Sequence, residues 1–196
     1  MAEITIPTIK ASSVTFGLER ADNVLQLLNG REVITVFAKA SWVAKVSLTI
    51  LTEQEGKAWA GVMSALSSFD NFFRMTPPGY SGPVYTGSTP QVNGAGQLGV
   101  TMSIKNCTPS AVVFRPGEYF EVNGELKIVT ATATANGSGV ASVSFQPALR
   151  AAPANNLSLV ITNPKAKFRM ANPSASWQIQ PGKFYITSLD VVELVQ

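Results

Sequence analysis

The chain has 196 residues, of which 45% are hydrophobic and 14% are charged, and its formal net charge is +3. This length and apolar content predict one large or two small domains whose cores need no metal or disulfide. Without histidine and with Cys107 as its single cysteine, the chain cannot form an intrachain disulfide, a Ser-His-Asp or Cys-His catalytic group, or a zinc site of cysteine and histidine ligands. The low charged fraction favours a protein whose surfaces are covered by neighbouring subunits.

The first third of the chain alternates apolar and polar residues in the manner of β-strands. We expect strands over 14–18, 33–38 and 42–50, the last of them long and half-buried. A turn signal at Asn29-Gly30 precedes the second strand.

One amphipathic helix is expected over 53–69. Thr52 is a suitable N-cap, and Glu55 three residues later completes a capping box. The apolar residues of this segment share one face, which indicates packing against a sheet; they are Trp59, Val62, Met63, Leu66 and Phe69.

A proline- and glycine-rich elbow at 77–83 and a change of texture after it indicate a second domain inserted in the first. The motif Phe-Arg-Met occurs at 73–75 and again at 168–170, which suggests where the chain leaves the first domain and returns. We therefore predict a mainly β protein with two domains. The first is a β-sandwich of residues 1–85 and 166–196 that contains the helix, and the second is an inserted small β-barrel of residues 87–165.

Short strands separated by turn signals predict the barrel. They include 100–104, a hairpin turning at Asn123-Gly124, 140–145 and 157–161, with a loop over 147–156. A further strand region is expected over 184–195, in the first domain.

Two patterns invite a catalytic or cofactor interpretation, and neither has the context it needs. Gly94, Gly96 and Gly99 match G-x-G-x-x-G, but a strand and not a helix is expected to follow them, so we predict no cofactor. Glu121 and Glu125 flank a predicted hairpin turn, where exposure to solvent is expected. We expect neither a catalytic residue nor a bound metal, and therefore no enzyme.

Small barrels bind oligosaccharides or single-stranded nucleic acids on one face. The barrel segment has few basic residues, which disfavours nucleic acid, and a weak contact with host-surface glycans stays open. The beginning of the chain has no signal-peptide pattern and no window approaches 18 apolar residues, so we expect assembly in the cytoplasm without membrane insertion.

The order of these segments resembles the distal tail proteins of long, flexible-tailed bacteriophages. The similarity rests on the 42–50 strand, the Leu-Thr-Glu-Gln-Glu-Gly-Lys-Ala-Trp segment at 51–59, the proline elbow, the Phe-Arg-Pro-Gly-Glu-Tyr-Phe-Glu-Val hairpin at 114–122 and the returning Phe-Arg-Met. It covers the chain from about residue 30 to residue 194, and these motifs are structural ones.

The resemblance implies a virion protein of the tail tip, in which a belt domain forms a hexameric ring. That ring would join the tail tube protein to the hub and fibre proteins, and DNA would pass through its lumen without specific binding. The inserted domain would be an outward barrel, either like an oligonucleotide/oligosaccharide-binding fold or galectin-like.

Two alternatives remain: another tail or connector subunit (tube, terminator or minor tail protein), and a stand-alone carbohydrate-binding module. For the ring, we take exposed-strand and elbow residues as candidate subunit contacts: Val36, Trp42, Val46, Tyr80, Tyr185 and Val191.

Overall fold

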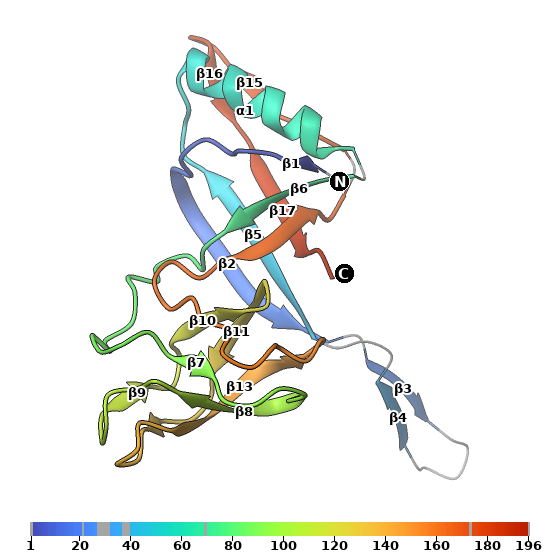
Figure 1. Ribbon diagram of the computed structural model, residues 1–196. Coiled ribbons are helices and arrows are strands. Elements are labelled where there is room, and N and C mark those ends of the chain that lie inside the picture. The colour runs from blue at the N-terminus through green and yellow to red at the C-terminus, as the bar shows by residue number, and fades with distance from the viewer. Residues whose placement is uncertain are drawn as a thin grey trace. The chain divides into compact units, whose positions relative to one another are not determined.

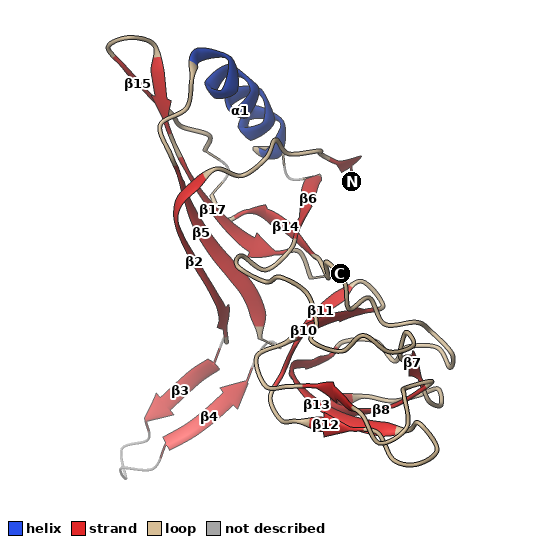
Figure 2. Cartoon of the chain, turned by 90° about the vertical axis from the view of Figure 1, so that its left-hand side faces the viewer, coloured by secondary structure: helices blue, strands red, loops and turns tan. Residues whose placement is uncertain are grey.

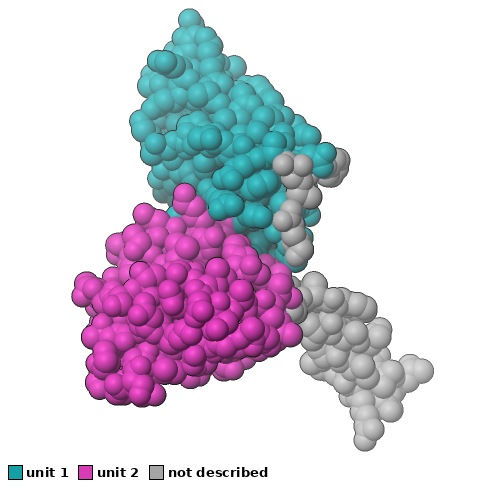
Figure 3. All heavy atoms as spheres, viewed as in Figure 1, with its two compact units in different colours: residues 1–19, 41–78, 167–196 teal, residues 20–40, 79–166 magenta. Residues whose placement is uncertain are grey.

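The computed structural model describes residues 2–20, 22–26, 32–36, 40–68, 70–172 and 174–195. Over these ranges the chain forms seventeen strands and one helix (Figures 1 and 2). The predicted class, mainly β with one helix and a small curled barrel, is confirmed. Two compact units are present (Figure 3). Unit 1 comprises Met1–Glu19, Ser41–Pro78 and Lys167–Gln196, and unit 2 comprises Arg20–Ala40 and Gly79–Ala166.

These units divide the chain differently from the predicted domains at three places. We placed 20–40, 79–85 and residue 166 in the first domain, whereas the structure groups all three with unit 2. The stretch over 79–85 belongs to unit 2 because it is hydrogen-bonded to residues of that unit. The Tyr80 hydroxyl donates to the Tyr119 carbonyl at 3.2 Å, and the Val84 amide donates to the Glu118 carboxylate at 3.0 Å.

Unit 1 is built on a six-stranded sheet. Its strands in spatial order are β1 (Ala2–Glu3), β6 (Asn71–Met75), β14 (Ala166–Met170), β17 (Ser188–Glu193), β5 (Ser41–Leu48) and β2 (Ala11–Glu19). The two Phe-Arg-Met segments lie in β6 and β14, which are neighbours in this sheet. Alternation in β5 places four side chains in the core, those of Trp42, Ala44, Val46 and Leu48.

The helix α1 (Glu53–Leu66) begins at the predicted N-cap, and the capping box between Thr52 and Glu55 is present. It ends at Leu66, three residues before the predicted end. The C-cap is Ser67, whose hydroxyl donates back to the Ser64 carbonyl at 2.7 Å. Such serine side chains compete with the helical hydrogen bonds and favour termination. Trp59, Met63 and Leu66 are buried as expected, together with Gly56; Val62 is half-buried, and Phe69 lies outside the described residues.

Two antiparallel strand pairs lie outside the large sheets, one in unit 1 and one in the 20–40 segment of unit 2. The strands β15 (Gln178–Gln180) and β16 (Phe184–Ile186) pair with each other, and β16 continues to Leu51 through two 3.0 Å hydrogen bonds between Leu51 and Tyr185. The strands β3 (Asp22–Gln26) and β4 (Glu32–Val36) form an antiparallel pair in which Val24 lies opposite Ile34. Of the strand predicted over 33–38, residues 33–36 lie in β4, and residues 37 and 38 lie outside the described residues.

Unit 2 contains a five-stranded antiparallel sheet. Its strands in spatial order are β10 (Tyr119–Val122), β11 (Glu125–Val129), β13 (Ala141–Leu149), β8 (Gly99–Lys105) and β7 (Gln91–Val92). A further pair, β9 (Val112–Phe114) and β12 (Ala133–Thr134), packs on the same core. Buried aromatic rings meet inside it, with the Phe120 and Phe145 centroids 5.5 Å apart and edge to face.

The segment over 157–161, predicted as a strand, forms isolated bridges at Ser158 and Val160 and no continuous strand, and through them it closes this sheet into a barrel. On one side the Val160 and Glu121 backbones exchange hydrogen bonds of 2.8 and 2.9 Å, which attaches the segment to β10. On the other side the Val92 amide donates to the Leu157 carbonyl and the Leu159 amide donates to the Pro90 carbonyl, both at 2.9 Å. Because both outer strands bond to the same segment, the two edges of the sheet are satisfied.

The turn between β10 and β11 was predicted correctly, whereas the end of β13 was not. Asn123 and Gly124 both have positive φ, 53° and 75°, as a two-residue turn joining β10 and β11 requires. The loop predicted over 147–156 begins at residue 150, because β13 continues through Pro147 to Leu149. A register shift between Ser144 and Leu149 allows a residue without an amide hydrogen to stay in the strand.

The Glu125 side chain is buried and not exposed as the hairpin position predicted. Its carboxylate accepts a 2.6 Å hydrogen bond from the Lys127 ammonium, which is fully buried, and further bonds from the Arg150 and Ala151 amides. The Lys127 ammonium also donates to the Ala148 carbonyl at 3.0 Å. The ion pair therefore joins β11 to the end of β13.

Replacing Lys127 by Met should lower the free energy of unfolding by about 3–5 kcal/mol, because a buried carboxylate loses its counter-charge. The double variant Glu125→Gln/Lys127→Met should recover much of that loss. Urea unfolding measures both, with Lys57→Met as the control, because the Lys57–Glu53 pair lies on the surface and solvent screens it. A Lys127→Met variant as stable as the wild type would contradict the structural role of this pair.

Candidate assembly surfaces

The strand β2 lies at one end of the six-stranded sheet and offers a long edge. It has nine residues and pairs with β5 from Ala11 opposite Leu48 to Glu19 opposite Ser41. Its only charged side chain is Glu19, at its end, and it contains no proline. Native edge strands usually carry lysines, prolines or strong bulges that prevent pairing with other chains. In β2 the one feature of this kind is a register shift between Ala11 and Ser13, at the start of the strand. An edge of this length with one terminal charge is therefore suited to pairing with another chain.

The opposite end of the sheet is formed by different residues. There β1 pairs in parallel with β6 only at Ala2 opposite Asn71 and Glu3 opposite Phe72. The two ends of the sheet are therefore unlike each other in sequence, in length and in pairing, which is parallel for β1 and antiparallel for β2. If two copies of the sheet were joined end to end, the contact would be heterologous, and such contacts generate rings or filaments.

Three of the predicted contact residues are core residues of unit 1. Trp42, Val46 and Val191 are only 2%, 1% and 2% exposed. They lie on β5 and β17, which are interior strands of the sheet with a neighbour on each side. Their side chains are therefore not available to a neighbouring subunit, and the edge of β2 replaces them as the candidate surface. Val36 lies in β4, and its side chain is outside the described residues.

The two predicted tyrosine contacts are half-buried and bonded within their own units. Besides its bond to Tyr119, Tyr80 packs edge to face on the Tyr119 ring with centroids 5.4 Å apart, and burial raises its pKa. Tyr185 lies between Leu51, to which its backbone is paired, and the helix α1. Both tyrosines thus hold their own unit together, and neither is a free anchor.

The contact between Tyr185 and the helix explains why the helix contains a buried glycine. A Cβ atom placed on Gly56 would lie 2.1 Å from Cγ of the Tyr185 ring, closer than any real carbon contact. The tyrosine ring therefore packs directly on the helix backbone. Gly61, on the exposed side of the same helix, would meet nothing within 4 Å.

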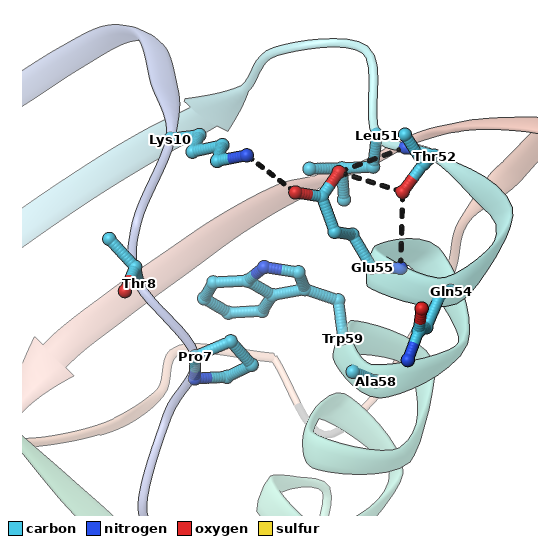
Figure 4. A pocket seen from close by; sticks show the side chains of 9 residues that line it. All are labelled: Pro7, Thr8, Lys10, Leu51, Thr52, Gln54, Glu55, Ala58 and Trp59. Carbon is cyan, nitrogen blue, oxygen red and sulfur yellow. Dashed lines mark hydrogen bonds and ion pairs between the residues drawn. The ribbon is translucent and has the colours of Figure 1, made fainter.

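A pocket of about 450 Å³ lies between the N-terminal segment and the start of α1 (Figure 4). The Trp59 ring and Pro7 form one wall, and the Lys10 side chain reaches the Glu55 carboxylate. The second oxygen of Glu55 accepts the Thr52 amide at 3.1 Å. One glutamate thus completes the helix cap and also holds the segment that leads into β2.

The charges and hydrogen bonds at the first turn of α1 favour the ionised form of Glu55. The hydrogen bond from Lys10, followed by those from Thr52, lowers the pKa of Glu55 to about 2. The hydrogen bond from Lys57 likewise lowers the pKa of Glu53, and the pKa of Lys57 is raised in return. Of these interactions, the one between Lys10 and Glu55 attaches the entry to β2 to the helix at neutral pH.

The glycine motif at 94–99 lies in the connection from β7 to β8, and a strand follows it. The Gln97 side chain fills this connection. It accepts the Ser103 amide at 2.6 Å and donates to the Asn93, Gly94 and Ser103 carbonyls. The loop is therefore organised around its own glutamine.

Among the described residues, no group of three or more cysteine and acidic side chains is placed to hold a metal ion. Over the same residues, no helix has the length and apolar character that crossing a membrane requires. Comparison of the chain with models of known protein families gives no match, and comparison with curated proteins gives none either.

Replacing Gly56 by Ala should destabilise unit 1 by about 1–3 kcal/mol, because the new methyl group overlaps the Tyr185 ring. Gly61→Ala is the matched control and should stabilise the same helix by about 1 kcal/mol, since alanine is the better helix former and space is open there. Urea unfolding distinguishes them. Equal gains from both substitutions would show that Tyr185 does not pack on the helix.

The depressed pKa of Glu55 predicts a loss of stability in acid. The ionised form stabilises the fold fully above the ordinary carboxyl value of 4.5, and this contribution disappears as the pH falls from 4.5 towards about 2. Glu55→Gln should therefore show a shallower decline of melting temperature across this interval than the wild type. Glu53 is unchanged in both proteins, so parallel curves would contradict the assigned role of Glu55.

Proposed function

We propose that the chain is a structural subunit of a phage tail that assembles through the edges of its six-stranded sheet into a closed ring. The observation that carries the proposal is the nine-residue strand β2 at the end of that sheet, with its single terminal charge. The low overall charge of the chain, 14% of residues, fits surfaces that are covered in an assembly.

A ring needs two complementary surfaces on each subunit, related head to tail. The β2 edge and the β1–β6 edge are such a pair, because they lie at opposite ends of one sheet and differ from each other. Pairing the β2 edge of one copy with the β1–β6 edge of the next would continue the sheet from subunit to subunit. The backbone groups that meet along this contact would then be bonded; because β1 has two residues and β2 has nine, the contact covers part of the β2 edge.

The place of this ring in the particle comes from the resemblance to distal tail proteins. The ring, of six subunits, would lie at the distal end of the tail tube and connect the tube protein to the hub and fibre proteins. DNA would pass through its lumen without specific contacts.

Light scattering of the purified chain during size-exclusion chromatography tests the proposed assembly. The wild type should have the mass of a closed oligomer of the 20.8 kDa subunit. Thr15→Lys places a charge on an exposed position of the β2 edge strand and should shift the mass to that of the monomer. Ser142→Lys is the matched control, because Ser142 is exposed on β13, an interior strand of the barrel sheet.

The control variant should assemble like the wild type, and circular dichroism should show that both variants are folded. A wild-type chain that stays monomeric at every concentration and with tail tube protein present would overturn the ring. Assembly that is equally strong in Thr15→Lys would overturn the role of β2.

A further inference from the structure

The exposed face of the six-stranded sheet carries a groove of about 480 Å³. It lies where β2, β5 and β17 meet the segment that leads into β15. Its polar lining comes from Ser12, Ser47, Ser188, Ser176 and Gln178, and its main aromatic wall is Trp177. The volume falls within the range typical of sites for small ligands.

The serines of this groove are aligned by the register of the sheet. Ser47 of β5 lies opposite Ser188 of β17, and both residues line the groove. Adjacent strands are about 4.8 Å apart, so hydroxyl groups repeat across the groove at about that spacing. Ser12, at the register shift of β2, adds a further hydroxyl to the lining and donates to the Ser47 carbonyl at 3.1 Å.

Several polar groups of the groove remain available to a ligand. Within the described part of the chain, the side-chain hydroxyls of Ser47 and Ser188 and the side-chain amide of Gln178 have no hydrogen-bond partner. Thr187, by contrast, is buried at the base and is satisfied by the Ser176 carbonyl at 2.9 Å. The available groups can both donate and accept hydrogen bonds.

Trp177 differs from the other two tryptophans of the chain. It is 40% exposed, whereas Trp42 and Trp59 are each 2% exposed and belong to the core. A tryptophan ring offers a large apolar face together with a polar N–H. Beside a row of hydroxyls and an amide, an exposed ring of this kind can pack against a ligand that has both an apolar ring face and hydroxyl groups.

The residues that line the groove include no acidic or basic side chain. A charged ligand would find no counter-charge there, so the lining favours an uncharged one. We propose that this groove binds a neutral saccharide, whose ring face packs on Trp177 and whose hydroxyls bond to the serine row and Gln178. The site belongs to unit 1, and the proposal does not depend on ring formation or on the barrel.

The full chain can be tested directly with a panel of neutral glycans that includes maltotriose, cellotriose and chitotriose, with trigalacturonic acid as the charged comparison. Saturation-transfer NMR detects binding. Acrylamide quenching of tryptophan fluorescence reports on the site, because Trp177 is the exposed tryptophan. At least one neutral glycan should bind at millimolar concentration and protect the fluorescence, and the acidic trisaccharide should not.

Trp177→Ala should weaken binding by about tenfold or more, and Gln178→Ala should weaken it without changing the melting temperature. Leu98→Ala, an exposed apolar residue of unit 2, is the control and should bind like the wild type. No binding across the neutral panel, equal binding of the acidic trisaccharide, or undiminished binding by both groove variants would each overturn the proposal.

Discussion

The need to satisfy backbone hydrogen bonds at sheet edges is the constraint on which the rest of this structure depends. In unit 2 the segment over 157–161 bonds to β7 and to β10, so the barrel sheet has no open end. In unit 1 the six-stranded sheet ends in a long strand, β2, and in a two-residue strand, β1. Because open edges bind other strands, the two units have different capacities: one is closed on itself and the other is suited to assembly.

Buried carboxylates connect segments that are distant in the sequence. Glu118 accepts the Val84 and Arg115 amides, Glu125 accepts the Arg150 and Ala151 amides, and Glu193 accepts the Trp42 amide at 3.0 Å. Hydrogen bonds to a charged acceptor are stronger than those between neutral groups. In a chain with only twelve acidic residues, these three hold the elbow, the end of β13 and the start of β5.

Local sequence signals predicted the elements better than their connections. The capping box fixed the start of α1, and Asn123-Gly124 fixed the hairpin, because both depend on neighbouring residues only. Strand order depends on distant partners, so alternation in β5 and β17 suggested contacts such as Trp42 that are in fact interior. For the edge position of β2, the sequence held one weak signal, the absence of charged residues in the strand before Glu19. The serine groove could not be predicted, because it depends on the register of three strands.

Electron microscopy of the purified chain at high concentration tests the central claim most directly. We expect closed rings with a single rotational axis, and reconstructions in which the β2 edge of each subunit pairs with the β1–β6 edge of the next. Separate monomers at all concentrations and beside the tail tube protein, or rings in which β2 faces solvent, would contradict it.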